Sequence, residues 1–289
     1  MQFQMINNFQ HKTATVLASA IRKAKDVRIA VAFVSRDGLS QIMPSVETAL
    51  GMGAYVEFLV GMDSHATDPK AVKELYELSC GNSHASLLCF VSRNVSAIYH
   101  PKMYLTRDDE IATAIIGSSN LTQGGLTSNI EANVVIRDDV QAEIVSEIYS
   151  TYSRLKYHPD IVIPDRDFIE MFFKLCEHKN LIECRLAKDS ELKRLKKTLV
   201  EKAKTLQRPK PTRTDLVGWL KLVYDYLPEG SFTNREIYKY EDEFSSRYPQ
   251  NLNIRAKIRQ QLQILHKLGF IEHISRGVWK KVGSDGLQR

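Results

Sequence analysis

The segment Tyr99–Asn120 reads YHPKMYLTRDDEIATAIIGSSN and contains the two patterns that decide the fold. Its first part alternates as a strand does, and a period of two places His100 and Lys102 on one face. The apolar run Ile111–Ile116 predicts the next strand, which leads into a turn formed by Gly117–Asn120. Small residues in that turn allow a phosphate to approach the backbone. The segment therefore predicts a site for phosphoryl chemistry between two neighbouring strands.

Hydrolysis of a phosphodiester needs a nucleophile, donors for the charged phosphoryl oxygens and an acid for the leaving oxygen. A neutral imidazole can attack phosphorus, and its pKa of about 6.5 lets a second imidazole serve as the acid near neutral pH. We expect His100 to be the nucleophile, and Lys102 and the Asn120 amide to hold the phosphate with Ser118 as a further donor. The nearest acidic residues, 108–110, are predicted to be a surface turn. The sequence thus predicts no metal ion and no cofactor.

A lone His-x-Lys has a simpler interpretation, which is a strand edge with two exposed polar residues. The wider context resembles the phospholipase D superfamily, whose motif is HxK, usually an Asp after four further residues, and then GSxN. His100, Lys102 and the turn ending at Asn120 match, whereas Arg107 stands in the place of the Asp, with Asp108 one position later.

The nuclease branch of this superfamily also has a Glu about eleven residues after the motif Asn, and Glu131 stands there. The resemblance implies that Glu131 holds the imidazole of His100. Two motifs make one active site in this superfamily, and the chain has one HxK with a GSxN partner. The resemblance, which covers about residues 1–155, therefore implies a homodimer in which two copies of His100 face each other across a two-fold axis. One would form a phosphohistidine and the other would protonate the leaving oxygen.

Composition is that of an ordinary globular protein, with 289 residues, of which 43% are hydrophobic and 26% charged. Forty Lys and Arg against 34 Asp and Glu give a net charge of +6. The cysteines Cys80, Cys89, Cys176 and Cys184 have neither zinc-ligand nor disulfide-framework spacing, which favours reduced thiols. With no signal peptide and no long apolar run, we expect a cytoplasmic protein that contacts no membrane.

Strand-like and helix-like segments alternate over residues 1–160, which predicts an α/β nuclease domain with a mixed sheet flanked by helices. Several strands are continuous apolar runs, as strands buried on both faces are. Helices are expected at Lys12–Ala24, Leu39–Leu50, Pro69–Leu78 and Gln141–Leu155, and strands at Val27–Val34, Tyr55–Val60, Ser86–Val91, Ala97–Leu105, Ile111–Ile116 and Glu131–Ile136.

Residues 161–211 have a helical pattern with dense cations and are predicted to form a linker between domains. Two interpretations are open, because the cations could follow DNA phosphates or could form the solvated face of a helix that bridges the dimer. The cations are Lys188, Lys193, Arg194, Lys196, Lys197, Lys202, Lys204, Arg208 and Lys210.

Residues 212–289 read as three helices and a hairpin, the order of a winged helix. Thr233 and Glu236 form a capping box at the second helix, and Asp215 is a candidate N-cap of the first. The third helix has apolar residues at helical spacing from Ile254 onward, and Gly269 closes it.

The stretch Tyr248–Gln263, with Gly269–Ile271 and Arg276–Trp279 after it, resembles the C-terminal winged helix of Dam-replacing, methyl-directed restriction endonucleases. In that family the module binds DNA; whether its preference for methylated adenine extends to this chain is left open, because readout depends on individual side chains. The alternative is a protein-binding winged helix with a solvated basic face. The expected base readers are Arg255, Arg259, Gln260 and Gln263; Lys257 and Lys267 are expected nearer the phosphates, and Arg276 and Lys280 at a neighbouring groove or backbone.

Together these features predict a homodimeric type II restriction endonuclease that hydrolyses double-stranded DNA without a metal ion. One alternative is a DNA-binding regulator with an inactive nuclease fold. Another is a phospholipase D-type enzyme of DNA repair or of lipid phosphodiesters, although the sequence shows no membrane-facing apolar segment.

Overall fold

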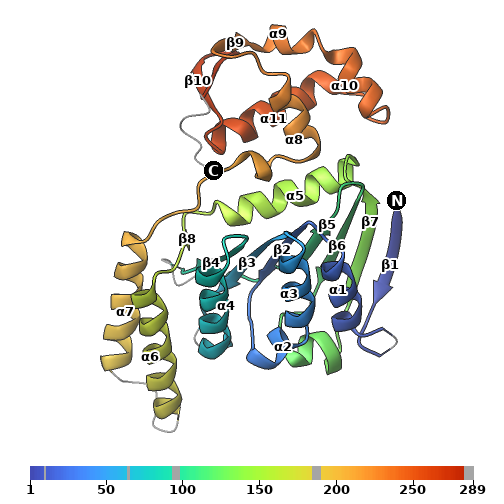
Figure 1. The fold of residues 1–289 in the computed structure, drawn as a ribbon. Helices are drawn as coiled ribbons and strands as arrows, with labels where there is room; N and C mark the ends of the chain where they lie inside the picture. Colours follow the sequence, from blue (N-terminus) through green and yellow to red (C-terminus); the bar gives the residue numbers. More distant parts are fainter. Residues whose placement is uncertain (10, 64–65, 93–97, 184–189, 283–289) are drawn as a thin grey trace. The chain divides into compact units, whose positions relative to one another are not determined.

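The computed structural model of this chain forms two compact units (Figure 1). The first unit contains Met1–Asp138 and His158–Pro209, and the second contains Asp139–Tyr157 and Lys210–Arg289. The chain therefore passes from one unit to the other three times, after residues 138, 157 and 209. The residues that the structure describes are 1–9, 11–63, 66–92, 98–183 and 190–282.

The first unit is built on an eight-stranded mixed sheet with the order β1-β7-β6-β5-β2-β3-β4-β8. Strands β2, β3 and β4 are parallel neighbours, whereas β5 runs antiparallel to both β2 and β6. The α/β class and the mixed sheet that the sequence predicts are confirmed. The strands are β1 (Gln2–Ile6), β2 (Asp26–Val31), β3 (Tyr55–Gly61), β4 (Ala85–Phe90), β5 (Lys102–Arg107), β6 (Ile111–Gly117), β7 (Asn133–Asp139) and β8 (Ile161–Val162).

The central strands are buried along almost their whole length, which explains their continuous apolar sequences. The edge strands β1 and β8 had no counterpart among the expected segments. Four residues of β1 are exposed and β8 is two residues long, so neither has the buried apolar run by which a strand is found in a sequence.

Figure 1 shows α1, α3 and α4 along one face of this sheet, with α6 and α7 beyond α4. The helix expected at Leu39–Leu50 is two helices, because Pro44 lies at the start of α3, where its missing N–H is tolerated, and cannot lie inside a longer helix. The helices of this unit are α1 (Thr13–Arg22), α2 (Arg36–Ser40), α3 (Met43–Gly51), α4 (Pro69–Gly81), α6 (Arg166–Glu183) and α7 (Ser190–Thr205).

The second unit contains the predicted winged helix, with its own core around Trp219, Phe244, Ile258 and Leu262. Its three strands have the order β10-β11-β9. The expected second helix is divided into α9 and α10. The elements are α5 (Glu143–Lys156), α8 (Gly218–Asp225), β9 (Ser231–Thr233), α9 (Asn234–Tyr238), α10 (Glu241–Arg247), α11 (Ile254–Lys267), β10 (Ile271–Ser275) and β11 (Val278–Lys281).

Local signals at the helix ends of this unit are largely confirmed. Thr233 and Glu236 form the expected capping box of α9, and Gly269 follows α11 with a φ of 81°. The N-cap expected at Asp215 is wrong. Asp215 is instead the third residue of a short 3₁₀ helix, Arg213–Asp215, in a capping box with Thr212, and α8 begins later at Gly218.

Helix α5 belongs to the second unit. The buried Lys156 amino group is 3.1 Å from Asp215 Oδ1, and Tyr157 donates a hydrogen bond to the other oxygen of the same carboxylate. Gly218 has a φ of +55°, and a Cβ there would lie 2.4 Å from the Ser146 side chain, so α8 approaches α5 too closely for any other residue. The boundaries expected at residues 160 and 211 stay predictions about domains.

Candidate active site

His100 lies directly before β5 rather than inside the strand that the sequence predicts. Strand β5 begins at Lys102, because Pro101 has no N–H for the ladder, although its carbonyl accepts a bond from Ala32 N at 2.9 Å. Ala97, the expected first residue of this strand, is outside the described residues. Lys102 Nζ lies 2.6 Å from His100 Nδ1 and 3.1 Å from Nε2. The expected meeting of the imidazole and the cation is therefore present.

The two side chains have different surroundings. His100 is exposed, and its ring lies edge-on to Phe33 with centroids 5.6 Å apart. Lys102 is buried, with 6% of its surface exposed, and burial lowers the pKa of its amino group against the opposite influence of the negative charge on Glu131. The site thus combines an accessible imidazole with a partly desolvated cation.

The turn after β6 is fixed by close backbone packing. A Cβ on Gly117 would lie 2.3 Å from Ala132 O and 2.5 Å from Asn133 Oδ1, so glycine is required there. The Tyr104 hydroxyl donates to Ser119 O at 2.8 Å, and burial raises the pKa of that hydroxyl well above its usual range. It therefore stays a donor to the turn.

Asn120 is also oriented by the backbone. Its Oδ1 accepts a hydrogen bond from Phe33 N at 3.2 Å, which leaves the amide nitrogen as the end that can donate to a ligand. Since the Phe33 ring contacts His100, this one residue connects the amide and the imidazole.

Glu131 does not hold the imidazole within this chain, contrary to the expectation from the family. Its carboxylate accepts hydrogen bonds from Ser118 Oγ and from Asn129 Nδ2, the latter at 3.3 Å. It lies two residues before β7 rather than opening that strand. The placement explains the electrostatic influence on Lys102, and it makes Ser118 a partner of Glu131 rather than a free donor.

Sequence reasoning missed the residues that support the turn. Asn133 donates to Ser119 Oγ at 2.9 Å and to Thr13 Oγ1 at 3.2 Å, and Asn8 Oδ1 accepts from the Thr13 backbone N–H at 3.2 Å. Asn133 could have been found, because an Asn inside an apolar strand must bond to something when it is buried. Asn8 has no such signal in the sequence.

The departure from the family motif at Arg107 has a structural explanation. Arg107 Nε is 2.8 Å from Asp26 Oδ2, and Arg28 Nε is 3.1 Å from the other oxygen of that carboxylate. Asp108 accepts hydrogen bonds from the backbone N–H groups of Ile111 and Glu110, which lower the pKa of its carboxyl group. These residues therefore stabilise the sheet and its turn, away from His100 and Lys102.

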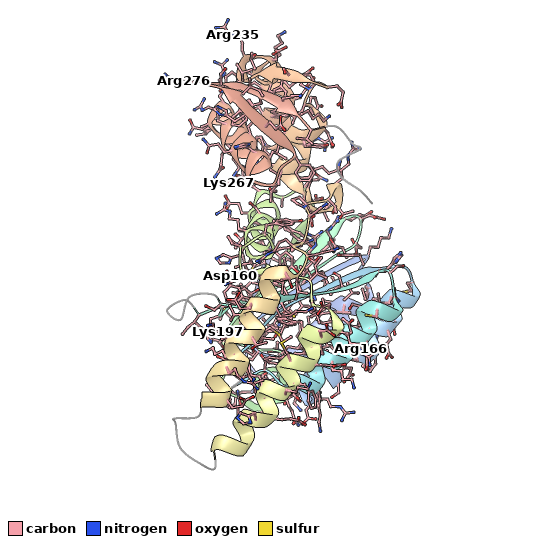
Figure 2. The ribbon with its side chains drawn as sticks, turned by 90° about the vertical axis from the view of Figure 1, so that its left-hand side faces the viewer. Asp160, Arg166, Lys197, Arg235, Lys267 and Arg276 are labelled. Carbon is pink, nitrogen blue, oxygen red and sulfur yellow. The ribbon has the colours of Figure 1, made fainter. Side chains whose placement is uncertain are left out.

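The candidate DNA-binding residues of the second unit divide into two groups. Lys257 is largely buried, and its amino group lies 3.4 Å from Glu143 and 3.5 Å from Glu147 of α5, so a phosphate contact would require these pairs to break. Figure 2 labels Lys267 and Arg276, two members of the second group. The members of this group, all exposed, are Arg255, Arg259, Gln260, Gln263, Lys267, Arg276 and Lys280.

Several cations of the predicted linker are paired with carboxylates of the same segment. Arg194 pairs with Glu191, Lys204 with Glu201, and Lys202 with Asp165 and Asp167. This pairing is what a solvated helical face predicts. The interpretation as a phosphate track relies on exposed cations such as Lys196, Lys197 and Lys210, and Figure 2 labels Lys197. Lys188 lies outside the described residues.

Comparison with known families finds two matches in this chain. Residues 17–156 match the family model described as "Cardiolipin synthase, PLD-like domain". The chain therefore contains a phospholipase D-like domain. Residues 213–281 match the model described as "Dam-replacing HTH domain". The protein thus joins a phospholipase D-like domain to a Dam-replacing helix-turn-helix domain, and both resemblances found in the sequence are confirmed.

Solved structures similar to this chain include NucT from Helicobacter pylori, with 16% identity and a TM-score of 0.41, over 54% of this chain and 93% of that chain. The phospholipase D family member Nuc from Salmonella typhimurium has 22% identity and a TM-score of 0.41, over 54% and 91%. Phosphatidylserine synthase from Haemophilus influenzae Rd KW20 has 14% identity and a TM-score of 0.46, over 63% and 46%. Among the helices of the described residues, none combines the length and apolar character that crossing a bilayer requires.

Proposed function

We propose that this protein is a type II restriction endonuclease that hydrolyses double-stranded DNA as a homodimer and without a metal ion. The observation that carries the proposal is the contact of Lys102 with His100, beside the oriented amide of Asn120. A helix-turn-helix domain in the same chain supports DNA as the substrate.

In the proposed reaction a phosphodiester oxygen takes the place of the imidazole as partner of the Lys102 ammonium. The freed ring nitrogen of His100 attacks phosphorus, so that an N–P bond forms while the P–O bond to one deoxyribose oxygen breaks. The second subunit's copy of His100 gives its proton to that oxygen. Water then attacks the phosphohistidine, the second imidazole accepts the proton of that water, and the N–P bond breaks.

In the proposed homodimer a second copy of the chain would cover two exposed isoleucines near the site. Ile98, two residues before His100, is 79% exposed, and Ile130, next to Glu131, is 85% exposed. A second copy that covered them would also bring the second imidazole that the reaction needs.

The first test is cleavage of supercoiled plasmid in excess EDTA. We expect cleavage by the parent chain, loss of cleavage in His100→Ala, and full activity in the control His84→Ala, which changes an exposed histidine elsewhere. Cleavage that requires Mg²⁺ would show the mechanism to be wrong.

A second test addresses the alternative of an inactive nuclease fold. Acid-labile labelling of His100 by a phosphodiester substrate is expected from the proposed intermediate. Specific DNA binding without any labelling or cleavage would favour the regulator instead.

A further inference from the structure

Two arginines of α11 converge on one tyrosine of α9. The guanidinium carbon of Arg255 lies 5.4 Å from the centre of the Tyr238 ring, and Arg259 Nη1 donates to the Tyr238 hydroxyl at 3.1 Å. Arg255 Nε also donates to Glu241 Oε2 at 2.7 Å. Two long, exposed side chains are therefore held by contacts within the second unit before any ligand binds.

These contacts leave a free pair of donors on each guanidinium. With its Nε bonded to Glu241, Arg255 retains its two terminal nitrogens, and with its Nη1 bonded to Tyr238, Arg259 retains the Nε and Nη2 edge. A pair of parallel donors matches O6 and N7 of guanine in the major groove. Each arginine thus keeps the geometry that bidentate recognition of guanine requires.

The opposite side of α11 is occupied. Lys257 lies about half a turn from Arg255 and Arg259 around the helix and pairs with Glu143 and Glu147 of α5. Lys257 is therefore turned toward α5, whereas Arg255 and Arg259 stay exposed and can reach a ligand.

We propose that Tyr238 is a positioning residue which, together with Glu241, holds Arg255 and Arg259 as two preformed readers of guanine. Neighbours one helical turn apart are about 5–6 Å apart, and successive bases of one strand are about 3.4 Å apart. The two guanines therefore lie within about two base steps of each other. Holding the side chains beforehand reduces the conformational entropy lost on binding. This inference rests on the proposed recognition of DNA by the winged helix.

The test uses the full-length chain with His100→Ala, which prevents cleavage, and a randomised duplex library whose bound fraction is sequenced. Tyr238→Phe removes the hydroxyl bonded to Arg259 but keeps the ring beneath Arg255. We expect the preference for guanine to fall ~5-fold or more at one position, within the ~5- to 150-fold range of a bidentate contact. Glu241→Gln should weaken the other position, and Tyr238→Ala should weaken both.

Two measurements separate positioning from a loss of stability. The dependence of affinity on salt should stay the same in Tyr238→Phe, because no phosphate contact is removed. The control Tyr240→Phe changes a neighbouring tyrosine that packs against Tyr226, and its base preference should equal that of the parent.

Equal loss of affinity for all sequences, or unchanged guanine preference in Tyr238→Ala, would overturn the inference. Sequence-specific binding by the parent without any guanine preference would overturn it and leave the proposed function standing. A parent chain with no specific binding would overturn both.

Discussion

Replacing Gly117 by alanine tests whether close packing of β6 against the start of β7 holds the reactive turn in position. The added Cβ would lie 2.3 Å from Ala132 O and 2.6 Å from Asn133 Cα, where ordinary contacts begin at 3.4 Å. Backbone must therefore move by roughly 1 Å, and Ser118 and Asn120 move with it. Overpacking of this kind costs ~1–3 kcal/mol, and a displacement of about 1 Å at a catalytic group lowers the rate ~10²-fold.

The assay is single-turnover cleavage of plasmid DNA in EDTA, together with thermal unfolding of the same samples. The control is Gly81→Ala at the end of α4, where an added Cβ meets nothing within 4 Å, and it should cleave at the parent rate. If Gly117→Ala cleaved at the parent rate with an unchanged melting temperature, the steric argument would be refuted. A lower melting temperature with an unchanged cleavage rate would show that the substitution strains the fold but that cleavage does not depend on the exact position of the turn.

Three further predictions follow from the site and from the second unit. When equal amounts of parent and His100→Ala subunits assemble at random, about one quarter of the activity of the same total amount of parent protein should remain, because each site needs both imidazoles. Retention of one half of that activity would mean that the subunits act independently. Because burial lowers the pKa of Lys102 and the phosphate requires its charged form, activity should decline on the alkaline side at a pH below the usual lysine range. In Lys102→Arg the residual activity should persist to higher pH, because the guanidinium stays charged. If the alkaline decline of the pH–activity profile did not move in this variant, loss of the Lys102 charge would not be the cause of the decline. Lys156→Met should destabilise the second unit by ~3–5 kcal/mol, because Asp215 keeps a buried charge without its cation. Unfolding of this unit in urea can be followed by tryptophan fluorescence, because the unit contains both tryptophans of the chain. The matched control is Lys221→Met, which changes an exposed lysine.

Features that depend on residues close in sequence could be predicted. The capping box of Thr233 and Glu236 joins residues three apart, and the contact of His100 with Lys102 joins residues two apart, so periodicity and spacing were sufficient. The partners of Lys257 are at least 110 residues away on α5, and the sequence pattern gives no indication of which carboxylates they are. The same holds for Ser118 with Glu131, where the family motif suggested a different partner for the carboxylate.

The hydrogen bonds around the site distinguish the residues that support it from those proposed to react. Asn133 accepts a hydrogen bond from the Ser119 backbone N–H and donates to the hydroxyls of Ser119 and Thr13. The Glu131 carboxylate accepts hydrogen bonds from Ser118 and Asn129. Lys102 Nζ, by contrast, donates to the carbonyl oxygen of His100 at 3.0 Å and contacts the exposed imidazole, and a neutral imidazole is a weaker partner for a buried cation than a phosphate oxygen would be. A charged group held in this way binds an anion with little reorganisation, because its burial is already established in the folded protein. In the proposed mechanism the HxK motif supplies a cation and a nucleophile that bond to each other until a phosphodiester separates them, and the GSxN turn presents the amide of Asn120.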